Sequence, residues 1–388
     1  MTGFDIRASA PGKILLLGSY AVVDGYTGYV ITVDSRVHVR IRQLEGHEVR
    51  VSAPQFGVEG SGSIDSKTGE LNFKLPPGME VFKAAVEIPI KYLVCLGADV
   101  PGFHIEARND ANFSSGKTSK SGLGSSAGVT VAGIAAALAV SKHGSEASKV
   151  DKELVHKLSQ ISHSVATQKI GSGFDIAAAT YGSLIYKRYS PRLMERLPKD
   201  YTCDDIVKLT KEKWDYKVER FDLPKMFDIV YAGFRNESAS TVSFVSKVWD
   251  FKKRNPEGFD DIMHQINDAN VAALSSLKAV NGTDDRGPLE KFKDNFETAR
   301  HLTKELGNLS EVGIEPDECS DLIDRSRENG AFVAKLPGSG GKDSMVALTT
   351  DSQSKRRLVE YLNSRSELKV LDLKKDDAAG VRVNGTGP

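Results

Sequence analysis

The residues best suited to chemistry in this chain form a glycine- and serine-rich string, KSGLGSSAG, at positions 120–128. An apolar run, Ala127–Val140, follows and contains neither proline nor a charged residue. This pattern predicts a buried helix whose first turn is the glycine–serine loop. The start of a helix presents unpaired backbone N–H groups and the positive end of the helix dipole, so it favours anions. Because Lys117 and Lys120 add positive charge just upstream, we expect the ligand to be a phosphate group.

Other interpretations explain the string less well. Ser125 or Ser126 could cap the helix without any ligand. The string at 122–127 also fits a dinucleotide-binding fingerprint, but that fingerprint directly follows a strand, and residues 112–120 are polar. The P-loop pattern GxxxxGK[ST] needs a glycine where this chain has Ala111.

Two further positions could take part in the same chemistry. Lys13 ends the string APGK at 10–13, and Asp175 follows a second glycine–serine turn, GSG, at 171–173. Each also has a simpler explanation: Lys13 as a surface lysine after a Pro-Gly turn, and Asp175 as a helix N-cap. From the residues alone, both explanations stay open.

Composition excludes several classes of function. Lys+Arg and Asp+Glu are balanced at 52 each, so no overall field would attract nucleic acid or an anionic membrane. No apolar run reaches the roughly 18 residues of a membrane-spanning helix, and the first residues lack the apolar stretch of a signal peptide. The three cysteines, Cys95, Cys203 and Cys319, lack zinc-site spacing, which predicts buried, reduced thiols in a cytoplasmic protein.

The length of 388 residues is typical of about two or three domains. Strand and helix signals follow one another in an irregular order, which favours an α+β fold over a doubly wound parallel sheet. The charged segment 190–219 is the best candidate for a boundary, so we predict two domains, 1–190 and 191–388.

Local signals give expectations for single elements. The string APGK is expected to break a strand that begins near residue 4 and resumes at Ile14. Pro89 is expected to kink or split a helix over Glu80–Leu96. Three amphipathic helices are expected within 257–329, and the polar stretch 374–388 is expected to fray.

Three glycine-rich elements together resemble the motifs of the GHMP kinases, which phosphorylate small metabolites with ATP. The string PGKILLLGSY at 11–20 resembles the family's P-G-K…L-x-G-[ED]-[HY], and GLGSSA at 122–127 matches its phosphate loop residue for residue. The string GSGGKDS at 338–344 resembles G-x-G-G-G-D-C. The resemblance implies two α+β domains with the active site in the cleft between them. The N-terminal domain would be similar to ribosomal protein S5 and the C-terminal domain ferredoxin-like.

Within the family, the chain most resembles the phosphomevalonate kinase branch. That likeness depends on Lys120, on GSGFDIAAATYGSLIYKRYSP at 171–191, and on STVSFVSKV at 240–248. It implies ATP-dependent phosphorylation of (R)-5-phosphomevalonate to (R)-5-diphosphomevalonate, with ATP and Mg²⁺ bound, in isoprenoid precursor synthesis. We expect no nucleic-acid or membrane partner, and a monomer or homodimer in the cytoplasm.

The resemblance also assigns roles to residues. Lys13, Lys120 and Asp175 would be catalytic, and Ser126 and Asp175 would meet the metal ion. The phosphates of ATP would contact the loop made of Gly122, Leu123, Gly124, Ser125, Ser126 and Ala127. The acceptor would contact Lys13, Tyr20, Ser172, Ser240, Thr241, Ser339 and Gly340. Apart from the resemblance, two bound polyphosphates would need several cations. Further candidates are Lys117, Arg235, Lys335 and Lys342, and the simpler explanation of each is an ordinary solvated charge.

Some residues depart from the family pattern. Ser19 stands where many relatives have an acidic residue, and Pro337 and Lys342 replace residues of the third glycine loop.

Two alternatives to this function stay open. One is another GHMP activity, such as mevalonate kinase or diphosphomevalonate decarboxylase, and the other is a ligand sensor without catalysis on the same fold.

Overall fold

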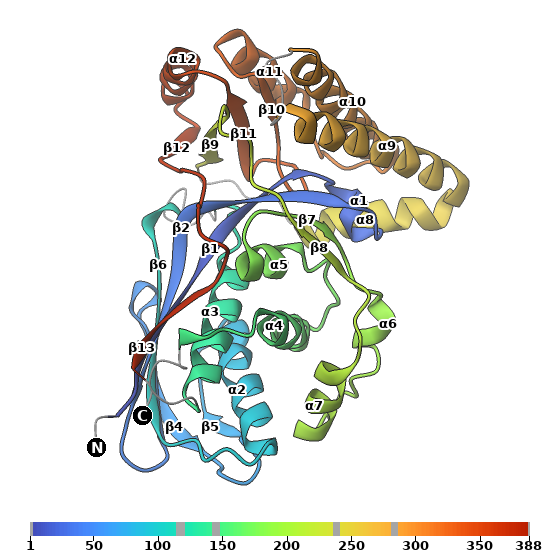
Figure 1. Ribbon diagram of the computed structural model, residues 1–388. Helices are drawn as coiled ribbons and strands as arrows, with labels where there is room; N and C mark the ends of the chain where they lie inside the picture. The colour runs from blue at the N-terminus through green and yellow to red at the C-terminus, as the bar shows by residue number, and fades with distance from the viewer. Residues whose placement is uncertain (1–2, 114–120, 142–147, 236–240, 281–285, 387–388) are drawn as a thin grey trace.

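The structure is a computed structural model that describes residues 3–113, 121–141, 148–235, 241–280 and 286–386. Two sheets form its framework, and helices cover them (Figure 1). Residues 114–120 and 236–240, which include Lys117, Lys120 and Ser240, lie outside the described residues. No helix in the described ranges combines the length and the apolar character needed to cross a bilayer.

The larger sheet has nine strands in the order β13-β1-β2-β6-β3-β4-β5, with β7 paired to β2 and β8 paired to β7. Neighbours are antiparallel except β3 and β6, which run parallel. Its strands are β1 Asp5–Leu17, β2 Gly28–Gln43, β3 Glu48–Ala53, β4 Val58–Ile64, β5 Leu71–Phe73, β6 Phe103–Asn109, β7 Leu184–Lys187, β8 Lys217–Arg220 and β13 Arg382–Thr386.

Helices α2, α3, α4 and α5 pack together along this sheet, with α3 directly against β1 and β2 (Figure 1). Helix α3 is buried on all sides because its residues are small and apolar, as the sequence predicts. The helices of this half are α1 Tyr20–Val23, α2 Glu80–Cys95, α3 Ser125–Ala139, α4 Lys152–Thr167, α5 Phe174–Tyr181, α6 Pro191–Met194 and α7 Cys203–Lys211, with 3₁₀ turns η1 Pro54–Phe56 and η2 Ala111–Phe113. Pro89 lies inside α2, which stays one helix, so a split at this position is wrong.

The smaller sheet has four antiparallel strands in the order β10-β11-β9-β12. Its strands are β9 Asp228–Phe234, β10 Val333–Lys335, β11 Ser344–Thr349 and β12 Leu368–Leu371, and its helices are α8 Thr241–Arg254, α9 Pro256–Val280, α10 Gly287–Leu309, α11 Asp317–Glu328 and α12 Ser352–Asn363. Counted along the chain within this sheet, the strand order is 4-1-3-2, which is ferredoxin-like. The predicted α+β class is therefore confirmed, as are the three helices expected within 257–329.

Two local expectations are wrong. The APGK string does not break the first strand, because β1 continues through it and absorbs the irregularity as a register shift between Pro11 and Gly12. The stretch after residue 374 does not fray either. It returns to the first sheet, where β13 pairs with β1.

The segment after residue 190 also stays with the first sheet. Helix α7 packs against α2 and α4, and β8 pairs with β7. The predicted division at 190/191 therefore cuts through packed structure. We propose instead that the second domain begins after Arg220 and ends before β13.

The C-terminal segment is held by a buried ion pair. Arg36 donates to Asp376 Oδ2 at 2.9 Å, to the carbonyl oxygen of Gly380 at 2.8 Å and to that of Ser9 at 2.9 Å. Both charged side chains are buried, with 8% and 6% exposed. Removing one partner of such a pair leaves the other charge buried without compensation.

We predict that Asp376→Ala lowers the free energy of unfolding by about 3 kcal/mol, within the range for a broken buried pair. Asp377→Ala is the matched control, because Asp377 is exposed and one residue away. Its effect is expected to stay below about 0.5 kcal/mol. Urea unfolding of both variants is the measurement, and equal midpoints would contradict the role given to Asp376.

Candidate active site

The three glycine-rich strings meet at one cavity of about 620 Å³. The N-terminal half contributes β1 with the turn after it, the second glycine loop and the segment before α5. The C-terminal half contributes the third glycine loop, β9 and α8. The lining side chains used below are Lys13, Ser19, Tyr20, Gly122, Ser172, Phe174, Asp175, Tyr231, Ser339, Asp343 and Ser344. Residues more than 300 positions apart in the sequence therefore share one wall.

Lys13 lines this cavity. Its Nζ donates to the carbonyl oxygen of Gly122 at 2.8 Å and stands 5.3 Å from the centre of the Phe174 ring. Burial lowers the pKa of Lys13, while the nearby carboxylates Asp175 and Asp343 raise it. A lysine held in this way is not a simple surface residue, so that explanation of Lys13 is wrong.

The second glycine loop has the geometry of an anion site. Gly124 is the N-cap of α3 in a left-handed conformation, φ 82°, and provides no side chain to cap the helix. Ser125 and Ser126 are the first two residues of the helix, so neither is its N-cap. Leu123 is buried and accepts a hydrogen bond from the Lys13 N–H at 2.9 Å. The residues from Leu123 to Ala127 continue from the cavity wall into the helix and do not line the cavity themselves.

Gly124 also sets the position of Lys13. A Cβ atom at Gly124 would stand 2.9 Å from Cε of Lys13, closer than real contacts allow. The absence of a side chain at this position lets the lysine lie against the loop.

Tyr231, on β9, connects the second and third glycine loops. Its hydroxyl lies 2.6 Å from the carbonyl oxygen of Ser121 and 2.6 Å from Oγ of Ser344. A hydroxyl has one hydrogen, so it donates to the carbonyl and accepts from Ser344. Burial raises the pKa of Tyr231, which keeps the hydroxyl protonated and able to donate.

Asp175 lies in the first turn of α5, whose N-cap is Gly173, so Asp175 is not the cap. Its Oδ1 accepts from the N–H of Ile176 at 2.9 Å. The preceding loop is fixed by Gln160 of α4, whose Nε2 donates to the carbonyl oxygen of Gly173 at 2.9 Å. The same Nε2 lies 3.0 Å from Nε2 of His156, and burial lowers the pKa of that histidine to about 3, so it is neutral and accepts.

The turn after β1 is tied to the third loop. The hydroxyl of Tyr20 donates to the carbonyl oxygen of Ser339 at 2.9 Å. Ser19 has a positive φ of 41°, and its Oγ accepts from Nζ of Lys335 at 2.9 Å. Burial lowers the pKa of Lys335 to about 8, partly offset by Glu315. Ser19 therefore gives the buried Lys335 a hydrogen-bond partner. It does not balance the positive charge of Lys335, as an acidic residue at this position would.

Other predicted residues have different positions. Gly340 is buried against the backbone of Ile314, where a Cβ atom would stand 2.2 Å from a carbonyl oxygen, and it does not line the cavity. Arg235 donates to the carbonyl oxygen of Leu368 at 2.8 Å, and Lys342 pairs with Glu318 at 2.6 Å, so both are engaged elsewhere. Thr241 begins α8, and nothing is described of its side chain.

The sequence did not single out Tyr231, Gln160 or His156. Tyr231 lies inside a strand of apolar residues, and its partners are more than 100 positions away. Gln160 and His156 are four residues apart on α4, so they share one face of the helix. Two polar residues on the buried face of a helix are a pattern in the sequence that could have indicated their role.

Comparison with known proteins identifies the family. The model of the GHMP kinases N terminal domain matches residues 80–183, and that of the GHMP kinases C terminal domain matches residues 289–367. Phosphomevalonate kinase of Candida albicans is 30% identical, over 89% of this chain and 89% of that protein. Phosphomevalonate kinase of Saccharolobus solfataricus is 31% identical, over 98% of this chain and all of that protein.

Among solved structures, the phosphomevalonate kinase of Streptococcus pneumoniae in complex with phosphomevalonate and AMPPNP has a TM-score of 0.74. It is 19% identical and covers 95% of this chain and 99% of its own, which shows a shared fold. The chain belongs to the GHMP kinase family, in its phosphomevalonate kinase branch.

We predict that Gly124→Ala lowers the rate of phosphoryl transfer about a hundredfold, because displacement of a catalytic group by about 1 Å has effects of this size. Gly97→Ala is the matched control. Gly97 has φ 81° against 82° for Gly124, but a Cβ atom there would meet nothing within 4 Å. Both variants carry the same left-handed strain of about 1–2 kcal/mol. Equal rates in the two variants would contradict the proposed contact between Gly124 and Lys13.

Proposed function

We propose that this chain transfers the γ-phosphoryl group of ATP to the phosphate of (R)-5-phosphomevalonate, which gives (R)-5-diphosphomevalonate and ADP in the mevalonate pathway. An acceptor phosphate oxygen forms a bond to the γ-phosphorus while the bond to the β,γ-bridging oxygen breaks, and ADP leaves. The observation that carries the proposal is the meeting of Lys13, Gly122 of the second glycine loop and Asp175 at one cavity. Phosphoryl transfer depends mainly on positioning and on charge neutralisation, which such a set supplies.

The donor side of the site is the second glycine loop. Backbone N–H groups at the uncapped start of α3 would hold the phosphates of ATP, from Gly122 to Ala127. Mg²⁺ would be held by the hydroxyl of Ser126 and the carboxylate of Asp175, because hard oxygen ligands are those that it prefers. When bound, the ion would neutralise charge on the transferred group. Lys120 would add a second cation on this side.

On the acceptor side, Lys13 would neutralise the accepting phosphate and the developing charge. The second pKa of a phosphomonoester is about 6, so the acceptor is already mostly a dianion at pH 7. A general base would have little proton to remove. We therefore assign Asp175 to orienting Lys13, the metal ion or the substrate, since the carboxylate acts electrostatically on Lys13.

The remaining acceptor contacts are assigned by position. Ser172, Tyr20 and Ser339 line the cavity and would contact the acceptor. Ser240 and Thr241 keep their expected role as donors near the start of α8. Gly340 would act by letting the third loop approach Ile314 closely, rather than by direct contact.

The first test measures ADP release with MgATP and, in parallel, 5-phosphomevalonate, mevalonate and diphosphomevalonate. Turnover with 5-phosphomevalonate alone is expected. Turnover with another acceptor would retain the ATP site and overturn the acceptor. If the chain binds ATP but forms ADP with none of the three acceptors, the alternative of a ligand sensor without catalysis is favoured.

Variants of the same assay assign the groups. Lys13→Ala is expected to lower kcat by at least about a hundredfold, as the loss of a charge-stabilising group does. Asp175→Asn is expected to weaken metal or substrate binding and to leave the shape of the pH–rate profile unchanged. A pH–rate profile that loses the signature of a catalytic base, with unchanged affinities for the metal ion and the substrate, would contradict the orienting role of Asp175.

Location and assembly stay predictions. The cysteine usage favours the cytoplasm, which fractionation of cells would check. Sedimentation would separate the monomer from the homodimer.

A further inference from the structure

Two of the three cysteines lie side by side in the structure. Cys95 is the last residue of α2, and Cys203 is the first residue of α7. Together with Asp204 they form a group whose two sulfur atoms and one carboxylate oxygen all lie within 4.8 Å of one another. The expectation of buried thiols is wrong for Cys95 and Cys203, which are partly exposed, and is confirmed for Cys319.

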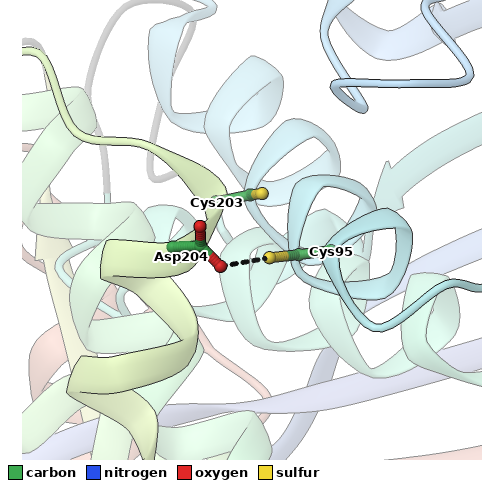
Figure 2. A group of neighbouring side chains, drawn as sticks. All are labelled: Cys95, Cys203 and Asp204. Atoms are coloured by element: carbon green, nitrogen blue, oxygen red, sulfur yellow. Dashed lines mark hydrogen bonds between the residues drawn. The ribbon is translucent and has the colours of Figure 1, made fainter.

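Figure 2 shows Cys203 and Asp204 at the beginning of α7, beside the end of α2 that carries Cys95. Sγ of Cys95 donates to Oδ1 of Asp204 at 3.2 Å. We propose that Cys95, Cys203 and Asp204 form a binding site for a thiophilic divalent cation of the zinc type, with its fourth position open to water.

The geometry is close to what such an ion needs. Zinc–sulfur bonds of about 2.3 Å place two tetrahedral ligand atoms roughly 3.8 Å apart. Sγ of Cys95 and Oδ1 of Asp204 are 3.2 Å apart, and all three ligand atoms lie within 4.8 Å of one another. Two sulfur ligands select zinc-type ions over magnesium or calcium, which prefer oxygen.

The surroundings leave this group free to act as ligands. The neighbouring Asp205 is occupied as part of a capping box, where its Oδ2 accepts from the N–H of Thr202 at 2.9 Å. Asp204 is exposed, and its carboxylate points toward Cys95 (Figure 2).

A cation that binds here would have to displace the proton of the Cys95 thiol. Burial, the Cys203 thiol and the Asp204 carboxylate raise the pKa of Cys95 to about 12. A bound cation reverses this effect, because coordination stabilises the thiolate.

The site would act as a clip between helices. Cys95 and Cys203 are 108 positions apart in the sequence. Helix α7 lies at the end of the first domain that is far from the second sheet (Figure 1). An ion bound by both helices would fix α7 to the core. This role is independent of the proposed kinase activity.

The test uses the full, untagged chain under a phosphine reductant. Cd²⁺ is titrated and the sulfur-to-metal charge-transfer absorption is followed, and Zn²⁺ is then measured by competition with a chromophoric chelator. One ion per chain is expected. Cys95→Ser and Cys203→Ser should each weaken binding more than about a hundredfold, beyond the loss typical of groups that only support a ligand. Asp204→Asn should weaken it less, and Cys319→Ala should leave it unchanged.

Thermal unfolding supplies a second readout that does not depend on kinase activity. Zn²⁺ at about 100 times its dissociation constant should raise the melting temperature of the chain by about 3 °C. It should not do so in the Cys95→Ser or Cys203→Ser variants, whose own melting curves report whether they fold. No ion bound by the reduced chain, or equal binding by these two variants and the unchanged chain, would overturn the proposal.

Discussion

The hydroxyl of Tyr231 is the contact on which the cavity depends. It stands on the second sheet, yet it donates to the backbone of the second glycine loop and accepts from Ser344 in the third. Both hydrogen bonds are buried, where they are stronger than in water and costly to break. Because Ser121 directly precedes Gly122, this contact fixes where the loop enters α3. The position of Lys13 follows, since its Nζ and its backbone N–H bind the next two residues of that loop.

Close backbone approach is the second constraint. Gly124 makes room for Lys13, and Gly340 makes room for the backbone of Ile314. The glycines thus allow three distant segments to meet. Glycine allows the close approach, and the helix start and Lys13 supply the charge. This division of roles explains why the matching GHMP motifs contain so much glycine and so few charged residues. It also explains why Gly340 takes part in the site without lining it.

Much of this arrangement could be predicted from short-range signals. The glycine–serine loop before an apolar run predicted where α3 begins, and the helical periodicity over 257–329 predicted the helices found there. Contacts between distant segments could not be predicted in this way. The return of β13 depends on Arg36, more than 300 positions earlier, and the pair of Cys95 and Cys203 depends on how α2 packs against α7. The likeness to the family predicted the cleft between the domains, but it did not predict the roles of Tyr231, Gln160 and His156.

The most direct test of this account compares kcat/KM for ADP formation in Tyr231→Phe and Tyr29→Phe. Both replacements remove one buried hydroxyl from a strand, but the hydroxyl of Tyr29 has no hydrogen-bond partner among the described residues. Loss of the Tyr231 hydroxyl leaves the carbonyl of Ser121 without its donor, at a cost of about 1–3 kcal/mol. The account predicts that kcat/KM falls about tenfold or more in Tyr231→Phe and stays within about twofold in Tyr29→Phe. Unchanged kcat/KM in a folded Tyr231→Phe variant would contradict it.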